Sequence, residues 1–488
     1  MSKFNTIATY PMPELTENKS GYVAYSMDPK SKLVSQVLTS FFNEEKFYGD
    51  NSSEIAETIK TVIKMDPKFV SNLAIFARKE FNMRSISHVL TGYLANIPEG
   101  KPYAKETVKE VVLRGDDATE ILAFYLDTFG KPIPNSLRRG LREVFTTFDA
   151  YTLGKYKGEG KSVKMKDLIC LCRPAPKDEE QSKLWKDLIE GKLETPYTWE
   201  TELSKRGNKK EVWEELISSG KVGYMALLRN LRNIMNATPN NIDLVFKRIA
   251  DPEEVRKSKQ LPFRYMSAYR NIPWDSWFKQ QAWEAIDAAA DISVENLPKI
   301  PGKTVIAIDV SGSMSGPVSN RSDIRCCDIA MLFGLIANRI CEKSIVYTFD
   351  TSIREMHIPK RNGLISTAVE ASSSGGGTNM HLPFIKMRDD HIDCDRVIVI
   401  SDCECNVAVS RWWGDPGSTV QAIADEYRKQ TKNDIWVHAI DLEGYGTQQF
   451  AGPKTNLIAG WSEKVFEFIP LAEQGEGALI KKIQEYRA

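Results

Sequence analysis

One stretch of the chain joins an apolar strand to an oxygen-rich loop. Residues 304–308 (TVIAI) have the β-branched composition of a buried strand, and Asp309, Ser311 and Ser313 follow at alternate positions. A carboxylate and two hydroxyls supply the hard oxygen ligands that divalent cations such as Mg²⁺ prefer. Because ligands bind at the carboxyl ends of strands in open α/β sheets, this segment predicts an α/β domain with a metal loop at the sheet edge.

Two later segments complete the predicted metal site. Residues 375–378 (GGGT) offer the hydroxyl of Thr378, and the apolar run 397–400 is followed by Ser401 and Asp402. We predict Mg²⁺, or another divalent cation such as Mn²⁺, with the hydroxyls as direct ligands and the aspartates acting through water. Ser and Gly after a strand are also ordinary turn formers, which is the alternative for each segment alone. In this order, the three segments resemble the metal-ion-dependent adhesion site of a von Willebrand factor A domain.

The hydrophobic pattern divides the chain into two predicted domains, residues 1–300 and 301–488. In the first, apolar residues such as Ile55, Ile59 and Val62 repeat at helical spacing between Pro, Gly and Asn turns, which predicts a helical-repeat assembly. In the second, strands alternate with helices, which predicts a mostly parallel sheet. The first domain is expected to hold no strands and to include helices at 105–112, 118–128, 135–145, 164–172, 209–218, 224–236, 241–249 and 283–290. The second is expected to hold strands at 304–308, 344–349, 396–400, 435–440 and 465–468, and helices at 328–339 and 419–429.

Charge and cysteine usage narrow the possible functions. The formal net charge is zero, yet residues 131–177 carry 11 Lys and Arg against 4 Asp and Glu, an excess that fits binding of a polyanion. The eight cysteines lack the C-x2-C pairs of zinc modules, so we expect reduced, buried thiols. No apolar stretch is long enough to span a bilayer, and the start lacks a signal-like segment, so we expect a cytoplasmic protein with no membrane partner.

The helical part resembles the TROVE module of Ro ribonucleoproteins. Five segments carry the resemblance: 135–141 (NSLRRGL), 153–157 (LGKYK), 165–168 (MKDL), 173–177 (RPAPK) and 226–231 (ALLRNL). Together with the metal loop, this order is similar to that of bacterial-type Ro proteins over nearly the whole chain. The resemblance implies an α-helical HEAT-like repeat ring, monomeric, closed by an α/β von Willebrand factor A (Rossmann-like) domain.

The same resemblance implies an RNA-binding protein that is not an enzyme. It implies a Y-like small noncoding RNA on the outer ring surface, single-stranded ends of misfolded RNAs in the ring, and a role in noncoding RNA quality control. In bacteria the Y RNA can tether such a protein to polynucleotide phosphorylase, and degradation then belongs to that partner. Basic side chains neutralise phosphates without reading bases, which gives broad, salt-sensitive binding.

The candidate RNA-binding residues are cationic side chains and one histidine. Lys155 matches a family position on the outer RNA-binding surface, and Arg173 stands where relatives often carry histidine. For His88 a structural role is the favoured alternative, and for Arg229 and Arg232 capping or pairing with acids is an equal one. The full set is Arg84, His88, Arg138, Arg139, Arg142, Lys155, Lys157, Lys164, Lys166, Arg173, Lys177, Arg229 and Arg232.

Two other functions are alternatives at this stage. One is a metal-dependent protein-adhesion module without an RNA role, in which the cation accepts an acidic side chain from a partner. The other is a metal-dependent nuclease that uses Asp309 and Asp402. Nuclease chemistry usually needs a carboxylate cluster that holds two metals together with a base, whereas a hydroxyl-rich site suits ligand capture. We therefore predict no catalytic residues.

Overall fold

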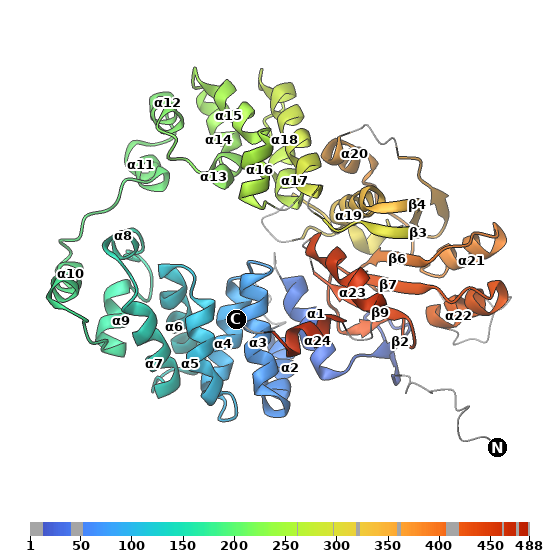
Figure 1. Cartoon of the computed structure of the whole chain (residues 1–488), viewed down its shortest axis with the longest axis horizontal. Helices are drawn as coiled ribbons and strands as arrows, with labels where there is room; N and C mark the ends of the chain where they lie inside the picture. Colours follow the sequence, from blue (N-terminus) through green and yellow to red (C-terminus); the bar gives the residue numbers. More distant parts are fainter. Residues whose placement is uncertain are drawn as a thin grey trace. The chain divides into compact units, whose positions relative to one another are not determined.

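The computed structural model describes residues 13–40, 52–260, 262–295, 297–318, 323–358, 363–406, 419–460, 463–474 and 478–486 (Figure 1). Contacts between Cα atoms group the chain into two compact units. The α/β unit comprises residues 1–42, 224–236 and 242–479, and the helical unit comprises 43–223, 237–241 and 480–488. The units interleave along the chain, and the domain boundary at residue 300 stays a prediction. None of the described helices is long and apolar enough to cross a membrane.

The α/β unit is built on a six-stranded sheet with the strand order β5-β4-β3-β6-β7-β9. The strands are β3 (Ile300–Asp309), β4 (Cys341–Phe349), β5 (Ile353–Glu355), β6 (Arg396–Ser401), β7 (Trp436–Asp441) and β9 (Thr455–Ala459). All neighbours are parallel except β5, which is antiparallel to β4. Because β4 and β6 flank β3 on opposite sides, the carboxyl ends of β3 and β6 lie at a topological switch point, where such sheets bind ligands.

Helices cover both faces of this sheet. Successive side chains of a strand point to opposite faces, so Val305 and Ala307 share one face while Ile306 and Ile308 share the other. The first face packs against α21 (Leu382–Asp389) and α22 (Val420–Thr431). On the second face lies α19 (Cys326–Ile340), so close that a Cβ at Gly334 would lie 2.1 Å from Ile308 Cδ1. Coverage on both faces explains the continuous apolar runs of these strands.

A hairpin near the N-terminus also belongs to the α/β unit. Strand β1 (Leu15–Glu17) pairs with β2 (Val23–Ser26), which pairs with β8 (Thr447–Gln448). Helix α1 (Pro29–Thr39) follows, and Ser35 donates a hydrogen bond to Asp441 Oδ2 at 2.8 Å. The expectation that the first 300 residues hold no strands is therefore wrong. Strands this short, with a partner so distant in the sequence, leave no local alternation to recognise.

Six helices that precede the sheet in the sequence also group, wholly or mainly, with the α/β unit. They are α13 (Tyr224–Arg229), α14 (Leu231–Ala237), α15 (Ile242–Ile249), α16 (Pro252–Ser258), α17 (Pro262–Arg270) and α18 (Lys279–Val294). The Tyr224 hydroxyl donates to Ile249 O at 2.7 Å, which ties α13 to α15. Asp287 of α18 accepts the amide of Ile365 at 2.7 Å, at the start of α20 (Leu364–Ala371).

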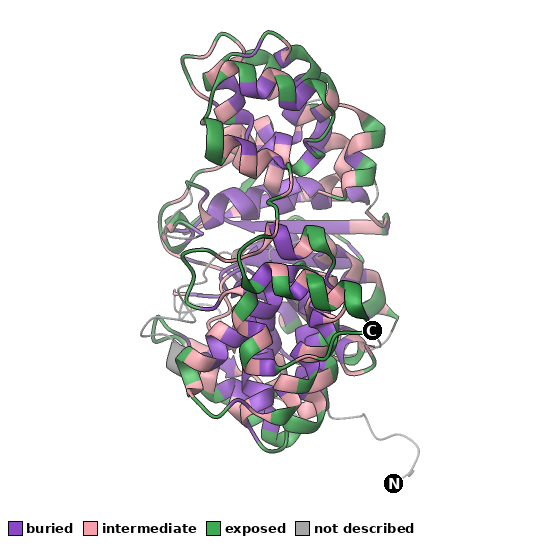
Figure 2. Cartoon of the chain, turned by 90° about the vertical axis from the view of Figure 1, so that its left-hand side faces the viewer, coloured by how far each residue is buried: buried purple, intermediate pink, exposed green. Residues whose placement is uncertain are grey.

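The helical unit is a succession of short helices that pack on their neighbours. They are α2 (Ser52–Met65), α3 (Pro67–Lys79), α4 (Ser85–Asn96), α5 (Lys101–Val111), α6 (Gly115–Phe129), α7 (Asn135–Phe145), α8 (Ala150–Lys155), α9 (Met165–Cys172), α10 (Glu179–Ile189), α11 (Trp199–Arg206) and α12 (Lys210–Ser218). Helix α3 packs on α4 and α5, α5 packs on α7, and α7 packs on α9. Figure 2 shows helices that are buried on one side and exposed on the other. The predicted fold class, a helical-repeat region with an α/β sheet domain, is confirmed; closure into a ring stays a prediction.

Two predicted elements need correction, and the prediction of buried thiols holds for every cysteine except Cys170. Residues 465–468, predicted as a strand, lie in the 3-10 helix η4 (Glu463–Glu467) and the start of α23 (Phe468–Glu473). A short buried apolar run does not by itself distinguish a strand from a helix. The helix predicted at 224–236 is interrupted at Asn230, between α13 and α14. All eight cysteines are free, and only Cys170 is exposed.

Candidate metal loops and basic surface

Three loops meet at the carboxyl ends of β3 and β6. The Gly375 amide donates to Val310 O at 2.9 Å, which ties the GGGT loop to the loop after β3. The Thr378 amide donates to the Asn406 side chain at 2.7 Å, which ties the GGGT loop to the segment after β6. Backbone and side-chain hydrogen bonds therefore bring together the three loops that carry the five predicted metal ligands.

The two aspartates of the predicted site are buried. Asp309 accepts hydrogen bonds from the Ser311 amide at 2.8 Å and from the Ser401 hydroxyl at 2.5 Å, while Asp402 accepts one from the Glu404 amide at 3.2 Å. Burial, followed by repulsion from Asp402, raises the pKa of Asp309, and burial also raises the pKa of Asp402. A bound cation would favour the charged forms and oppose both shifts.

The three residues predicted to supply hydroxyl ligands differ in burial. Ser311 is buried, Ser313 is exposed, and their Oγ atoms lie 3.1 Å apart. Thr378 Oγ1 is buried and has no hydrogen-bond partner within the described part of the chain. Leaving such an oxygen unpaired is costly, and ligation of a cation would remove that cost. The five oxygens therefore fit a hard divalent cation. The described residues contain no group of three or more His, Cys, Asp or Glu placed for a metal, so the hydroxyls are essential to this fit.

Sequence reasoning missed three side chains beside this site: Ser401, Glu404 and Asn406. Ser401 orients Asp309, and its place at the end of a strand, directly before Asp402, was an available signal. Glu404 is buried, which raises its pKa, and it accepts the amide of Ser20 at 3.0 Å and the hydroxyl of Ser20 at 3.1 Å. No local pattern reveals this contact, because Ser20 lies in the turn between β1 and β2.

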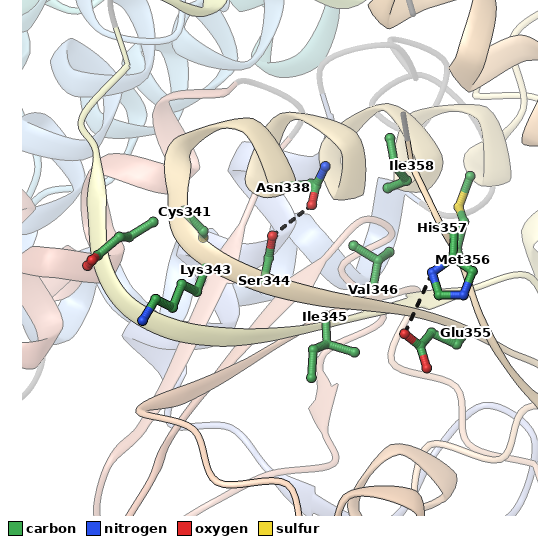
Figure 3. A pocket seen from close by; sticks show the side chains of 11 residues that line it. Asn338, Cys341, Lys343, Ser344, Ile345, Val346, Glu355, Met356, His357 and Ile358 are labelled. Carbon is green, nitrogen blue, oxygen red and sulfur yellow. Dashed lines mark hydrogen bonds and ion pairs between the residues drawn. The ribbon is translucent and has the colours of Figure 1, made fainter. Parts of the chain in front are cut away.

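Two pockets lie along the same side of the sheet. One, of about 480 Å³, includes Val310 and Gly375 of the metal loops in its lining. The other, of about 590 Å³, lies along β4 and β5 and shares Glu355 and Met356 with the first (Figure 3). In Figure 3 the hydroxyl of Ser344 points toward the side chain of Asn338, to which it donates at 2.7 Å. The first pocket therefore borders two of the metal loops, and none of the five predicted ligands is among its lining residues.

Helix α7 separates an apolar side from a basic one. Leu137 and Leu141 are buried, and a Cβ at Gly140 would lie 2.8 Å from Val108 Cβ of α5. This close approach fixes which side of α7 meets α5. Arg138, Arg139 and Arg142 are half-buried or exposed, and Glu143 is the acidic residue of the same helix. The i, i+4 spacing of Arg138 and Arg142 places these two on a common face.

The three arginines of α7 differ in their partners. Arg142 Nε donates to Cys172 O at the end of α9, so this side chain caps a helix. Arg138 reaches Ile133 O at 3.5 Å. Arg139 is exposed and has no hydrogen-bond or ion-pair partner within the described residues. Of the three, Arg139 has the charge most available to an external ligand.

Helix α9 and the segment after it carry four more predicted cations. They are Lys164, Lys166, Arg173 and Lys177, and none of their side chains has a carboxylate partner in the described structure. Lys166, Arg173 and Lys177 are exposed. Since α7 packs on α9, these cations and Arg139 lie on adjacent elements. Unpaired lysines and arginines on adjacent elements suit the phosphates of a nucleic acid.

Two predicted lysines have internal partners. Lys155 Nζ lies 3.5 Å from Glu200 Oε1 and 5.6 Å from the ring centroid of Tyr156. Lys157 Nζ donates to Leu193 O and, at 3.2 Å, to Thr195 Oγ1. An external phosphate would compete with these contacts. Their proposed RNA contacts stay predictions, and they are weaker candidates than Arg139.

Arg84 and His88 both contact one buried carboxylate. Arg84 Nε donates to Asp117 Oδ1 at 2.8 Å, and His88 Nε2 lies 3.2 Å from the same oxygen. The Arg84 side chain is 32% exposed, whereas His88 is buried. Both side chains therefore have a structural role in balancing Asp117. A contact of either with RNA stays a prediction.

The last two predicted cations, Arg229 and Arg232, lie in the α/β unit. Both are exposed and lack a carboxylate partner among the described residues. Arg232 reaches Asn271 Oδ1 at 3.5 Å. The predicted RNA-binding residues are thus divided between the two compact units.

Family models match most of the chain. The TROVE domain model matches residues 30–191 and 190–274, and the Ro60 vWA domain model matches residues 303–435. The structure of the Deinococcus radiodurans RO (RSR) protein superimposes with a TM-score of 0.63 at 17% sequence identity, covering 90% of this chain and 99% of that one. This likeness shows a shared fold.

Curated relatives share part of the sequence. "Telomerase protein component 1" of Rattus norvegicus is 25% identical over 325 residues, which are 49% of this chain and 12% of that protein. "RNA-binding protein RO60" of Caenorhabditis elegans is 25% identical over 210 residues, which are 40% of this chain and 32% of that protein. The chain therefore spans about a third or less of the length of these relatives.

Proposed function

Because the chain belongs to the TROVE domain family, we propose that it is an RNA-binding scaffold of a Ro ribonucleoprotein. One observation carries the proposal: six cationic side chains on α7, on α9 and on the residues that flank α9 lack carboxylate partners in the described structure. We call them the α7–α9 basic surface, and they are Arg138, Arg139, Lys164, Lys166, Arg173 and Lys177. Phosphate groups can bind there without displacing an existing ion pair.

The proposed ligands are a Y-like small noncoding RNA on the outer surface and the single-stranded ends of misfolded RNAs. The name of the worm relative, an RNA-binding protein, supports an RNA ligand. Phosphate contacts position a nucleic acid but carry no sequence information, so selectivity should be weak. We propose that the protein holds RNA for noncoding RNA quality control and does not cleave it. Degradation would then be the task of a partner such as polynucleotide phosphorylase.

The converging loops support a second proposal, a divalent-cation site. Ser311, Ser313 and Thr378 would ligate Mg²⁺ or Mn²⁺ directly, and Asp309 and Asp402 would act through water. A bound cation would supply a Lewis-acidic position that captures an acidic group of a partner. This adhesion role can coexist with RNA binding. The ligand set differs from the carboxylate clusters of two-metal nucleases, which supports capture over hydrolysis.

Reversing three cations of the α7–α9 basic surface tests the RNA proposal. We expect the combined change of Arg139, Lys166 and Arg173 to Glu to weaken binding of a structured RNA with a single-stranded tail roughly 30-fold at moderate salt. Each change removes a phosphate contact and adds repulsion. Fluorescence titrations across a salt series should also show a slope of log K against log salt that is shallower by about 1 for each residue.

A matched triple variant controls for net charge. Lys343, Lys429 and Lys432 are exposed, lack carboxylate partners in the described chain, and lie in the α/β unit. Their reversal to Glu changes the net charge by the same amount and should leave affinity within about threefold of the parent, because they lie outside the proposed contacts. Equal weakening by both triples, or unchanged affinity of the first, would contradict the proposed binding surface.

A further inference from the structure

The loop between α17 and α18 presents two tryptophans to solvent. Trp274 is 77% exposed and Trp277 is 98% exposed. A single exposed apolar side chain is ordinary on a protein surface, whereas neighbouring ones mark binding sites. Two indoles this exposed, separated by two residues on one short loop, are a candidate binding feature. The loop connects two helices of the α/β unit.

Contacts beneath Trp274 hold it in place. The ring of Trp283 stacks on Tyr269, with centroids 5.1 Å apart and 13° between the planes. The Trp274 centroid lies 6.1 Å from that of Trp283. Lys279 Nζ lies 3.7 Å from the Trp274 centroid and 5.2 Å from the Trp283 centroid. Trp274 is thus the exposed member of an aromatic cluster that also includes Trp283 and Tyr269. The ammonium group of Lys279 lies against this cluster, and these contacts exist before any ligand binds.

Trp277 follows a different pattern. Its neighbour Phe278 anchors the end of the loop, because the Phe278 ring lies 6.2 Å from that of Phe246 on α15. Trp277 itself has no aromatic partner within the described residues. At 98% exposure its indole is accessible to a planar ligand. The loop therefore carries one exposed indole that packs on other side chains, Trp274, and one that is almost fully exposed, Trp277.

Positive charge lies beside these rings. Arg232 reaches Asn271, the first residue of the loop, at 3.5 Å. In the described part of the chain, neither Lys279 nor Arg232 has a carboxylate partner, and Asp275 is the acidic side chain of the loop. The charge pattern complements a polyanion.

We propose that Trp274 and Trp277 form a stacking platform for unpaired RNA nucleotides, with Lys279 and Arg232 binding the flanking phosphates. The inference rests on the proposed RNA-binding function and adds a site distinct from the α7–α9 basic surface. Every base has an aromatic face, so such a platform tolerates any sequence. A protein partner would instead favour a continuous apolar patch with few charges at its centre.

Binding of a fluorescent oligouridine to the full chain tests the platform. The double variant W274A/W277A should weaken binding roughly 30-fold, since each lost stacking contact costs roughly fivefold or more. W274F/W277F keeps an aromatic face at both positions and should stay within roughly threefold of the parent. Both side chains are exposed, so both variants should fold, and thermal melting checks this. A fully paired RNA duplex is the second probe, and W274A/W277A should bind it as the parent does.

The outcomes separate this inference from the proposed function. If W274A/W277A binds oligouridine like the parent while the reversal of Arg139, Lys166 and Arg173 still weakens RNA binding, the platform is overturned and the proposed function stands. Equal losses for the alanine and phenylalanine variants would also overturn stacking. If the indoles change only self-association and not RNA affinity, the patch is a protein interface and the inference is wrong. A parent chain that binds neither RNA overturns both proposals.

Discussion

Replacing Asp117 by alanine should destabilise the protein by about 3–5 kcal/mol, the cost of removing one partner from a buried ion pair. Asp117 is fully buried, and the Arg78 side chain is 5% exposed. Arg78 NH2 donates to Asp117 Oδ2 at 2.9 Å, and the amides of Leu113 and Arg114 donate to the same oxygen at 3.1 and 2.9 Å. Without this carboxylate, the buried Arg78 guanidinium has no ion-pair partner among the described residues. Chemical denaturation followed by circular dichroism measures the change.

Glu57 supplies the control for that variant. It forms an ion pair with Lys60 at 2.7 Å on the exposed face of α2. Solvent screens such a pair, so Glu57→Ala should change the free energy of unfolding little. Asp117→Asn is a second comparison, because asparagine keeps the size of the side chain and removes only its charge. If Asp117→Ala and Glu57→Ala destabilise the protein equally, the buried carboxylate does not organise the helical unit as argued.

Asp117 should also make stability depend on pH in acid. Burial alone would raise its pKa, but hydrogen bonding and charge from His88, with the charges of Arg84 and Arg78, lower the pKa of Asp117 well below its usual range. A folded-state pKa below the unfolded value of about 3.9 contributes stability that is fully present above that value and lost as pH falls below it. The stability difference between the parent and Asp117→Asn should therefore be constant above about pH 5 and shrink below about pH 4. A constant difference down to pH 3 would contradict this assignment.

The parts of the fold that sequence predicts are those with local signals. The strands β3, β4, β6 and β7 read as apolar runs because helices cover both faces of the sheet. The DxSxS and strand-Asp segments each follow such a run, so their meeting at one edge follows from parallel topology. The GGGT segment lies between α20 and α21 and reaches this edge through the hydrogen bonds of Gly375 and Thr378. The β1–β2 hairpin has no such signal. Its turn docks through Asn18, which donates to Cys405 O at 2.7 Å, and such distant pairing leaves no periodicity.

The candidate RNA surface was predictable as a local charge excess but not in its details. Lys155 and Arg139 contribute equally to that excess, yet the structure pairs Lys155 with Glu200 and leaves Arg139 exposed. Which cation is neutralised depends on acids supplied by other helices, which composition does not reveal. The exposed Trp277 gave no sequence signal either, because a tryptophan beside apolar neighbours is more often buried.

Replacing Asp309 by alanine should weaken binding of Mg²⁺ and Mn²⁺ roughly 10- to 100-fold, because the change removes a carboxylate that would hold the cation through water. Thr378→Val, which keeps the shape of the side chain and removes the hydroxyl, should weaken binding about tenfold or more. Ser315 is an exposed serine of the same loop, and its hydroxyl donates to Gly312 O at 2.7 Å. Ser315→Ala is therefore the matched control and should bind like the parent. Isothermal calorimetry with each cation measures the affinities.

Thermal stability provides an independent test of the same site. The effect of Asp309→Asn should differ between the cation-free protein and the protein with Mg²⁺ added. Without a divalent cation, Asp309→Asn should melt at a higher temperature than the parent, because it removes one of two buried carboxylates that repel each other. With Mg²⁺ added, the parent should gain stability as the cation binds the folded state, and Asp309→Asn should not. If Mg²⁺ stabilises both proteins equally, the cation binds elsewhere. Repulsion between Asp309 and Asp402 destabilises the fold unless a cation binds between the loops. If Asp309→Asn instead lowers the melting temperature in the absence of the cation, the Asp309 carboxylate stabilises the fold, and this result would contradict the proposed metal site.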